Sequence, residues 1–321
     1  MTVQKLCVAF MGIAGLALAS CSSDSGSGTS AEANNEDTIQ VVTSTKVWSD
    51  IAAAVVGPDA TSGAEAGNKP ITITPIISSN NTDPHSYQPT AADMALVENA
   101  DILVAGGGHY DAWITKAASD QGDHVIISAL AFDDEGHAHE HAHDDHADHS
   151  EHAHDEHADH DHGDAEINEH VWYNVDKVID FAEELASELD LEASGVVKQM
   201  EEIQERKADI PAAKTAQIHP LADDILADTA IEDITPAGYR ATTLAEAEPS
   251  AADVNAMLEL INSGELDYLI NAPQTADSIS QRLVEAAQVK GIRIINVYES
   301  PSNDQTYFQL YQETLDQLEE E

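Results

Sequence analysis

Basic residues are scarce in this chain of 321 residues. Its 13 Lys and Arg accompany 60 Asp and Glu, which gives a formal net charge of −47. A surface of this sign repels phosphate, so the charge argues against nucleic acid as a partner, and it also argues against a charge-based role at a membrane surface. The excess of acid favours solubility and attracts cations. Adaptation to a salty habitat would give the same excess, and charge alone does not separate the two.

Cysteine is rarer still, and both cysteines, Cys7 and Cys21, lie near the N-terminus. Lys5 and the apolar run at 6–18 are typical of a signal peptide, because the run is too short to cross a bilayer as a helix. The small residues before Cys21 resemble a bacterial lipobox. We therefore predict that residues 1–21 are a lipoprotein signal and that Cys21 carries the lipid; secretion with a free Cys21 is the alternative.

Residues 22–38 are rich in Ser, Gly and acidic side chains, a composition that predicts a flexible tether. The rest of the chain has no thiol, so it can form neither a disulfide nor a thiolate metal site. Any metal site there must use His, Asp and Glu. The sequence also has no HExxH helix and no GxSxG elbow, and the glycine run at 106–108 lacks the Lys and Ser/Thr of a phosphate loop. We expect no enzyme activity.

Histidine is concentrated in one segment. Residues 137–162 contain eleven of the sixteen histidines, interleaved with Asp and Glu, and no Cys, Lys or Arg. A folded core cannot bury so many polar groups, so the segment predicts a solvated loop that collects divalent cations weakly. A merely acidic spacer is the alternative, although Asp, Glu and Ser would suffice for one. The predicted weak ligands are His137, His139, His141, His143, His146, His149, His152, His154, His157, His160 and His162.

Outside this segment, apolar runs alternate with helical patterns, which predicts α/β architecture with parallel sheets. Pro75 lies inside one of the apolar runs and argues against a central strand there. The predicted strands are 39–43, 71–77, 102–105, 125–128, 216–219, 268–270 and 292–297. The predicted helices are 48–56, 91–99, 175–189, 196–208, 251–261, 276–289 and 305–318.

Three of the five remaining histidines lie where a binding site is expected. His85 follows a strand and an Asp-Pro turn, and His219 ends a strand, so both lie at carboxyl ends of strands, where open α/β sheets bind ligands. His170 follows the histidine-rich segment. His109 and His124 have weaker surroundings, and we expect them to be structural.

Four short motifs make a more specific case. They are Asp-Pro-His-Ser-Tyr-Gln-Pro at 83–89, Glu-His-Val-Trp at 169–172, His-Pro at 219–220 and Glu-Ala-Glu-Pro-Ser at 246–250. Their order is the one seen in metal-binding lipoproteins of ABC importers. From about residue 39 to the end, the chain resembles the zinc/manganese substrate-binding family, and especially its zinc members with a histidine-rich insertion.

The resemblance implies two Rossmann-like α/β lobes joined by a long rigid helix, with the metal site in the cleft between the lobes. The implied divisions are an N-terminal lobe at 39–193 that contains the loop 137–162, a linking helix at 194–212 and a C-terminal lobe at 213–321.

By the same resemblance, His85 and His170 are metal ligands from the first lobe and His219 is the ligand from the second. Glu299 best matches the family's acidic fourth ligand, which water replaces in some zinc members. Two departures stand out. Asn168-Glu169 and Asn174 replace the usual Asp-Pro and Asp around the second histidine, so the hydrogen bonds behind it are expected to differ. The region 222–243 also lacks the usual aromatics, apart from Tyr239.

Three imidazoles and one carboxylate suit tetrahedral Zn²⁺, and His219 stands where manganese members more often have a carboxylate. We expect a monomeric protein, anchored by the lipid on Cys21 to the outer face of the bacterial cytoplasmic membrane, which is the periplasmic face in a Gram-negative cell. It would capture Zn²⁺ as cargo and deliver it to an ABC permease and its ATPase. The alternatives are a manganese or iron importer of the same family, and a surface zinc buffer or adhesin without a transporter.

Overall fold

The computed structural model describes residues 38–57, 65–66, 69–80, 82, 84–108, 110–119, 124–130 and 168–320. These residues lie in one compact unit, Glu36–Glu321. The predicted signal peptide, Cys21, the tether, His109 and the histidine-rich segment lie outside the described residues. None of the helices in the described ranges combines the length and apolar character that a membrane span requires.

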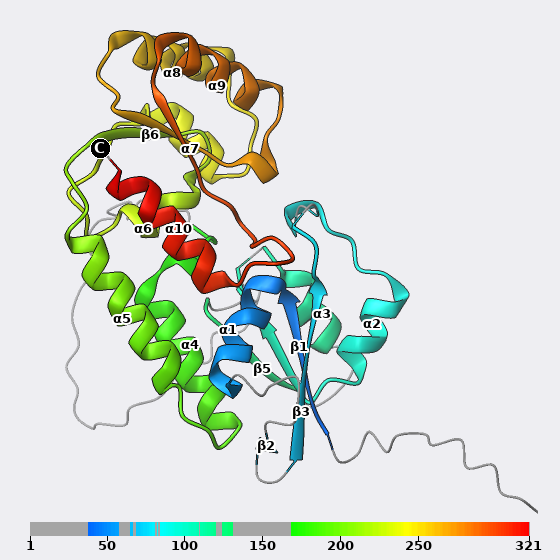
Figure 1. Cartoon of the computed structure of the whole chain (residues 1–321). Helices are drawn as coiled ribbons and strands as arrows, with labels where there is room; N and C mark the ends of the chain where they lie inside the picture. The colour runs from blue at the N-terminus through cyan, green and yellow to red at the C-terminus, as the bar shows by residue number, and fades with distance from the viewer. Residues whose placement is uncertain are drawn as a thin grey trace, which may run out of the picture. The chain divides into compact units, whose positions relative to one another are not determined.

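The first half of the chain forms a five-stranded sheet in the order β2-β3-β1-β4-β5 (Figure 1). Its strands are β1 (Ile39–Thr45), β2 (Glu65–Ala66), β3 (Lys69–Ile77), β4 (Ile102–Ala105) and β5 (Val125–Ser128). All pairs are parallel except β2 with β3. Among the described residues β2 pairs only with the first two residues of β3, so the outer side of β3 at Pro75 has no partner strand, and proline is tolerated on such an edge.

Helices cover both faces of this sheet, and the side chains of β4 pack against helices on each face. Ile102 and Val104 join a buried cluster with α1 (Lys46–Val56) and α4 (Val175–Glu188). Leu103 and Ala105 point the other way and pack with α2 (Ala91–Glu98) and α3 (Ala112–Ser119). A sheet buried on both faces is typical of parallel α/β structure and accounts for the uninterrupted apolar runs in the sequence.

The second half of the chain forms a four-stranded parallel sheet in the order β7-β6-β8-β9. Its strands are β6 (Lys214–Gln217), β7 (Glu232–Asp233), β8 (Tyr268–Asn271) and β9 (Arg293–Asn296). The predicted strand 216–219 therefore begins earlier and ends earlier, and His219 lies two residues beyond β6. Polar residues open β6, and one of them, Thr215, is buried with its hydroxyl donating to the carbonyl of Tyr268 at 3.2 Å.

Four helices accompany the second sheet: α6 (Asp223–Leu226), α7 (Ala237–Leu244), α8 (Ala251–Ser263) and α9 (Ser278–Lys290). Helix α8 begins at a capping box in which Ser250 and Asp253 satisfy each other's backbone N–H groups. Helices α8 and α9 pack side by side (Figure 1), and Met257, Ile261 and Leu283 enter the buried cluster under β6 and β8.

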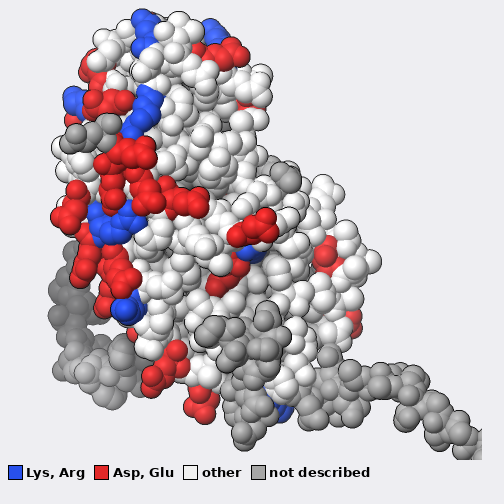
Figure 2. All heavy atoms as spheres, in the orientation of Figure 1, with Lys and Arg blue, Asp and Glu red and all other residues white. Residues whose placement is uncertain are grey.

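Helices α4 and α5 (Ser194–Ala208) lead from the first sheet to the second. The molecule thus consists of two parallel α/β lobes. The boundaries at 193, 194–212 and 213 remain a prediction. On the face shown in Figure 2, acidic side chains gather over α5 and the C-terminal end of α10 (Tyr307–Glu319). Arg206 lies among them and pairs with Asp316 at 2.7 Å and with Glu319 at 2.8 Å.

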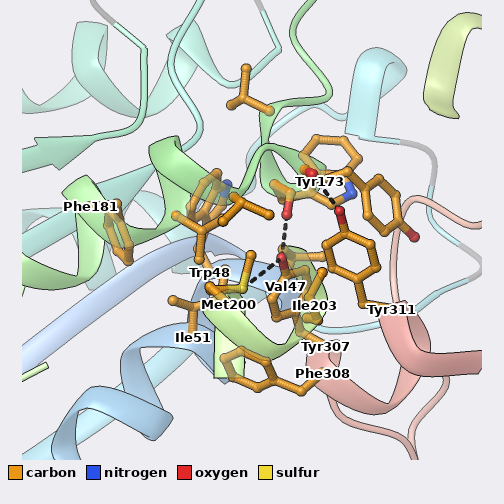
Figure 3. Packing of buried hydrophobic residues seen from close by; sticks show 14 of the residues in the cluster. Val47, Trp48, Ile51, Tyr173, Phe181, Met200, Ile203, Tyr307, Phe308 and Tyr311 are labelled. Atoms are coloured by element: carbon orange, nitrogen blue, oxygen red, sulfur yellow. Dashed lines mark hydrogen bonds between the residues drawn. The ribbon is translucent and has the colours of Figure 1, made fainter. Parts of the chain in front are cut away.

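Helix α10 ends the chain but packs against elements from its beginning. Tyr307 and Tyr311 are fully buried among Trp48 of α1 and Met200 of α5 (Figure 3). The Tyr311 hydroxyl donates to the carbonyl of Tyr173 at 2.7 Å, and that of Tyr307 donates to the carbonyl of Trp172. The same apolar cluster also contains residues of β8 and β9, so it is continuous from one lobe to the other.

Candidate metal site

Four side chains that can bind a metal converge between the two lobes. One ligand-capable atom from each of His85, His170, His219 and Glu299 lies within 4.8 Å of the other three. These are the four residues that the sequence singles out as ligands. His124 lies elsewhere, with its Nδ1–H donating to the carbonyl of Ala100 at 2.9 Å.

The parallel sheets account for this convergence. His85 lies in the short helix η2 (Pro84–Ser86) that follows β3, His219 follows β6, and Glu299 follows β9. The carboxyl ends of parallel strands meet at one edge of a sheet, and both sheets turn this edge toward the site. His170 is the exception, because it precedes the short helix η3 (Val171–Tyr173), which leads into α4.

The imidazoles surround one oxygen. From Glu299 Oε1, the Nε2 atoms of His85, His170 and His219 lie at 3.4, 3.8 and 3.9 Å, and the last two nitrogens are 3.1 Å apart. A tetrahedral Zn²⁺ with bonds of about 2.0–2.1 Å sets its ligand atoms about 3.3 Å apart. The spacing of this set therefore fits a small four-coordinate cation.

The site favours a neutral His219 beside an ionised Glu299. Burial, followed by the neighbouring His170 and His85, lowers the pKa of His219 to about 3 despite the opposing charge of Glu299. Burial alone would raise the pKa of Glu299, but hydrogen bonds and charge from His170 and His85 outweigh it and hold that pKa well below its usual range. Metal-binding imidazole must be neutral and metal-binding carboxylate ionised, so the protonation states suit a divalent cation.

Asn168 fixes the orientation of His170. Its amide nitrogen donates to the carbonyl of Pro220 at 2.7 Å and to Asp223 at 2.8 Å, so its oxygen must face the histidine. That oxygen accepts from His170 Nδ1 at 2.7 Å. With the proton on Nδ1, the lone pair of Nε2 points into the site. Asparagine thus supplies the acceptor that a carboxylate often supplies behind a metal-binding histidine.

Behind Asn168 lies a charged network. Arg240 donates to both oxygens of Asp223, at 2.9 and 2.6 Å, and also to Asp233 at 3.2 Å. Gln217 donates to Asp223 at 2.7 Å. Burial would raise the pKa of Asp223, but Arg240, Asn168 and Gln217 together lower it. The carboxylate therefore stays ionised and gives Asn168 a firm acceptor.

Gln274 links the loops that carry two of the predicted ligands. It lies in the short helix η5 (Pro273–Thr275), and its side-chain oxygen accepts from the backbone N–H of Glu299 at 2.6 Å. Its amide donates to the carbonyl of Asn80, in the segment before His85, at 2.8 Å. One amide thereby sets the position of Glu299 relative to the first lobe.

Tyr110 is a site residue that the sequence reasoning missed. Its ring packs edge-on against that of His85 at 4.8 Å, and its hydroxyl donates to Glu299 Oε2 at 3.5 Å. It is 5 % exposed and forms a wall of the site together with Trp172. Its position just after the glycines that follow β4, at the carboxyl end of a strand, was the available signal.

Those glycines form a packed turn. Gly107 has φ +91, and a Cβ on it would lie 2.2 Å from the carbonyl oxygen of Leu130, so only glycine fits. The buried carboxyl of Asp111 accepts from the N–H groups of Gly106 at 2.7 Å and Gly107 at 2.9 Å. Burial raises the pKa of Asp111 to about 6. The turn holds the backbone that presents Tyr110.

Glu246 is a second carboxylate beside the histidines, and it was singled out only as part of a motif. Its oxygens lie 3.8 Å from His85 Nδ1 and 3.7 Å from His219 Nε2. Its side chain is 45 % exposed, whereas that of Glu299 is 2 % exposed. Glu246 lines a cavity of about 380 Å³ together with both histidines, Glu248 and Asp277.

The family model described as ZnuA, zinc-uptake complex component A periplasmic, matches residues 41–193 and 196–321. The chain belongs to this family. Members are extracytoplasmic metal-binding proteins that work with the permease and ATPase of an ABC transporter, and they are generally not enzymes. Among curated proteins, the comparison finds no significant match.

Solved structures with the same fold share little sequence with the chain. FpvC from Pseudomonas aeruginosa in complex with Mn²⁺ is 14 % identical, with 88 % of this chain and 96 % of that chain covered and a TM-score of 0.59. A structure of ZnuA is 14 % identical, with 88 % of this chain and 98 % of that chain covered and a TM-score of 0.58. A mutant of the laminin-binding adhesin Lmb from Streptococcus agalactiae is 15 % identical, with 88 % of this chain and 98 % of that chain covered and a TM-score of 0.61. At these identities the likeness shows the fold alone.

Proposed function

We propose that this protein captures Zn²⁺ as cargo with His85, His170, His219 and Glu299 and delivers it to the permease of an ABC importer. One observation carries the proposal. Three imidazole Nε2 atoms surround a single carboxylate oxygen at 3.4–3.9 Å, close to the spacing of ligands around a tetrahedral zinc ion.

The donor atoms support zinc over manganese. Nitrogen-rich sets favour the later divalent metals, whereas Mn²⁺ takes more oxygen ligands and a higher coordination number. A manganese-importing role is the second candidate, because FpvC, a protein of the same fold, has been solved with Mn²⁺ and also with Ni²⁺. A surface adhesin or zinc buffer is a third candidate, since the fold is shared with Lmb. Metal uptake by cells separates this role from transport.

Glu299 has a defined part in the proposed site. Its negative charge offsets part of the cation's charge, and Tyr110 and Gln274 hold the residue in place. His219 and Glu299 come from the second lobe, and His85 and His170 from segments that pack on the first. A cation bound by all four would therefore hold the two lobes together.

The histidine-rich segment and Cys21 lie outside the described residues. We propose that the histidines of 137–162 form weak, exchangeable zinc sites that raise the local zinc concentration or sense its excess. We also propose that Cys21 carries a lipid that anchors a monomer to the outer face of the cytoplasmic membrane.

A competition titration of zinc against manganese tests the function, with elemental analysis, on the full chain and on a variant without residues 137–162. We expect the deletion to leave one tightly bound zinc that manganese does not displace. His85→Ala should abolish this binding, and the matched variant His124→Ala should retain it. Preference for manganese would keep the transport role and change the cargo. Absence of any tight site would overturn the proposal and leave the histidine-rich segment as the metal-binding part.

A further inference from the structure

The C-terminal end of helix α7 has a backbone that suits glycine. The N–H of Glu246 donates to the carbonyl of Thr243 at 3.2 Å, and that of Ala247 donates to the carbonyl of Thr242 at 3.0 Å. Glu246 itself has φ +51. This pair of bonds around a left-handed residue is the Schellman motif, whose left-handed position is usually occupied by Gly and sometimes by Asn. Glutamate has no local reason to be there.

Helix α9 ends in the same pair of hydrogen bonds, with glycine at the left-handed position. The N–H of Gly291 donates to the carbonyl of Gln288 at 3.0 Å, and that of Ile292 donates to the carbonyl of Ala287 at 3.0 Å. Gly291 has φ +74. At the end of α9 the left-handed position is thus occupied by glycine, the residue that adopts this conformation without strain.

Helix α4 supplies a second comparison. Asp190 has φ +55, its N–H donates to the carbonyl of Ser187 at 3.3 Å, and the N–H of Leu191 donates to the carbonyl of Ala186 at 2.8 Å. Aspartate is short and polar and is among the few residues that adopt this conformation readily. Asp190 lies at the junction of α4 and α5, where it faces neither the histidines nor Glu299.

The side chain of Glu246 accounts for its presence. Its two oxygens lie beside two different predicted ligands, at 3.8 Å from His85 Nδ1 and 3.7 Å from His219 Nε2. Glu246 is half-exposed in the wall of the cavity, whereas Glu299 is buried behind the histidines. A cation that enters through this cavity would meet Glu246 before it could reach Glu299. Strain retained at such a position points to a functional side chain.

We propose that Glu246 is a transfer ligand: it takes the cation from water at the mouth of the cavity and passes it to His219 and His85. This inference rests on the proposed function. Each step is a ligand exchange in which a water leaves the cation as a protein atom replaces it. In the final four-coordinate set Glu246 is released, so it affects the rates of entry and exit more than the affinity.

Two glycine variants of the full chain test the role. Glu246→Gly and Asp190→Gly place glycine at left-handed positions of matching helix ends. The melting temperature of the metal-free protein should rise more in Glu246→Gly, because glutamate is the more strained of the two residues there. Co²⁺ is a suitable probe, because four-coordinate cobalt in the cleft absorbs visible light strongly and hydrated six-coordinate cobalt on the histidine-rich segment absorbs weakly. Stopped-flow absorbance then gives the rate of entry, and mixing with EDTA gives the rate of exit.

We expect Glu246→Gly to slow both entry and exit by about fivefold or more, because the ligand that passes the cation in both directions is lost, with the equilibrium affinity within about threefold of the wild type. Glu246→Gln, which keeps the strain and loses the charge, should be slowed to the same extent. Asp190→Gly should match the wild type in both rates.

Three results would overturn the inference, and they are distinguishable. Equal rates in Glu246→Gly and Asp190→Gly would remove the transfer role and leave the proposed function intact. A large loss of affinity caused by faster exit alone would make Glu246 a permanent ligand instead. If the wild-type cleft takes up neither Co²⁺ nor Zn²⁺, the proposed function fails and the transfer role fails with it.

Discussion

Asn168 and Asp223 are joined by a hydrogen bond of 2.8 Å that crosses from the segment of His170 to the start of α6. The opposite side of the same amide accepts the Nδ1 proton of His170 at 2.7 Å. The orientation of one predicted ligand therefore depends on a carboxylate that follows another, His219, by four residues. Asn174 makes a similar crossing to Asp224 at 2.8 Å but contacts none of the four predicted ligands.

Asn168→Ala should lower zinc affinity by about 10–100-fold, because His170 loses the acceptor that fixes its tautomer. Asn174→Ala is the matched control. It removes the contact with Asp224 and the cap of α4, which should cost about 1 kcal/mol of stability, and it should leave the affinity nearly unchanged. Competition titrations and urea unfolding measure the two effects. Equal affinities in the two variants would refute the orienting role of Asn168.

Glu299→Gln should lower zinc affinity by at least about tenfold, since it removes the only buried anion within 4 Å of the three histidine Nε2 atoms among the described residues. Tyr110→Phe, which removes one donor to that carboxylate, should have a smaller effect. Titration with a competing chelator measures both. If Glu299→Gln binds zinc as tightly as the wild type, water and not Glu299 completes the coordination shell.

His219 should contribute a loss of stability to the metal-free protein as the pH falls below about 6.5. Burial lowers the pKa of His219 from 6.5 to about 3, so between these values the unfolded chain binds a proton that the folded chain excludes. Stability then falls with falling pH by at most about 1.4 kcal/mol per pH unit. Glu299, whose pKa is also lowered in the fold, acts in the same direction only below its ordinary value of 4.5.

His219→Gln isolates this contribution. Asp111 acts in the opposite direction, because burial raises its pKa from 3.8 to about 6 and its stabilising proton is lost as the pH rises through that range. The wild-type profile combines the two, and only the difference between variant and wild type reports on His219. In thermal unfolding between pH 5 and 7 (roughly the titration range of histidine), the variant should lose less stability on acidification than the wild type does. Parallel profiles would contradict the assignment.

Tyr307→Phe should destabilise the protein by about 1–2 kcal/mol, because the carbonyl of Trp172 loses a buried donor. Tyr311→Phe should behave alike through the carbonyl of Tyr173. Tyr87→Phe is the control at a partly buried hydrogen bond, since the Tyr87 hydroxyl donates to Asp93 at 2.7 Å. A smaller change is expected there. Urea unfolding gives all three values, and an equally small effect of all three would show that the buried bonds add little.

Zinc binding should change the angle between the lobes only slightly. The apolar cluster that runs from α1 through α5 and α10 to β8 and β9 resists a wide opening, because opening would expose its buried side chains. Solution scattering of the metal-free and zinc-loaded protein measures the change. A large swing between the two states would contradict this expectation.

Local sequence was sufficient where a segment carries its own pattern. Strands β4 and β5 lie at the predicted residues, because each is an apolar run bounded by polar or glycine residues. Strands β2 and β7 have two residues each and are too short to show any period. Helices α3 and α7 were not predicted. Each is eight residues long, and α7 contains Gly238 and two threonines, so tertiary packing decides their structure.

The site was predictable only in part, for a similar reason. The resemblance of ordered motifs identified four residues that the structure brings together, while Tyr110, Asn168 and Glu246 were not identified as site residues. Their roles depend on contacts between distant parts of the chain: Tyr110 lies 189 residues from Glu299, and Asn168 lies 55 from Asp223. The glycines before Tyr110 and the motif departure at Asn168 were local signals, but neither indicates the distant partner. The strain at Glu246 appears only with its backbone angle.

The four converging residues are far apart in the sequence, and this separation affects when the chain can bind a cation. His85 and Glu299 are 214 residues apart in the sequence, so only folding brings them together. A partly made or unfolded chain therefore has no cleft in which to hold a cation. A cation bound by all four residues would therefore be chosen from the ions present in the compartment where the chain folds.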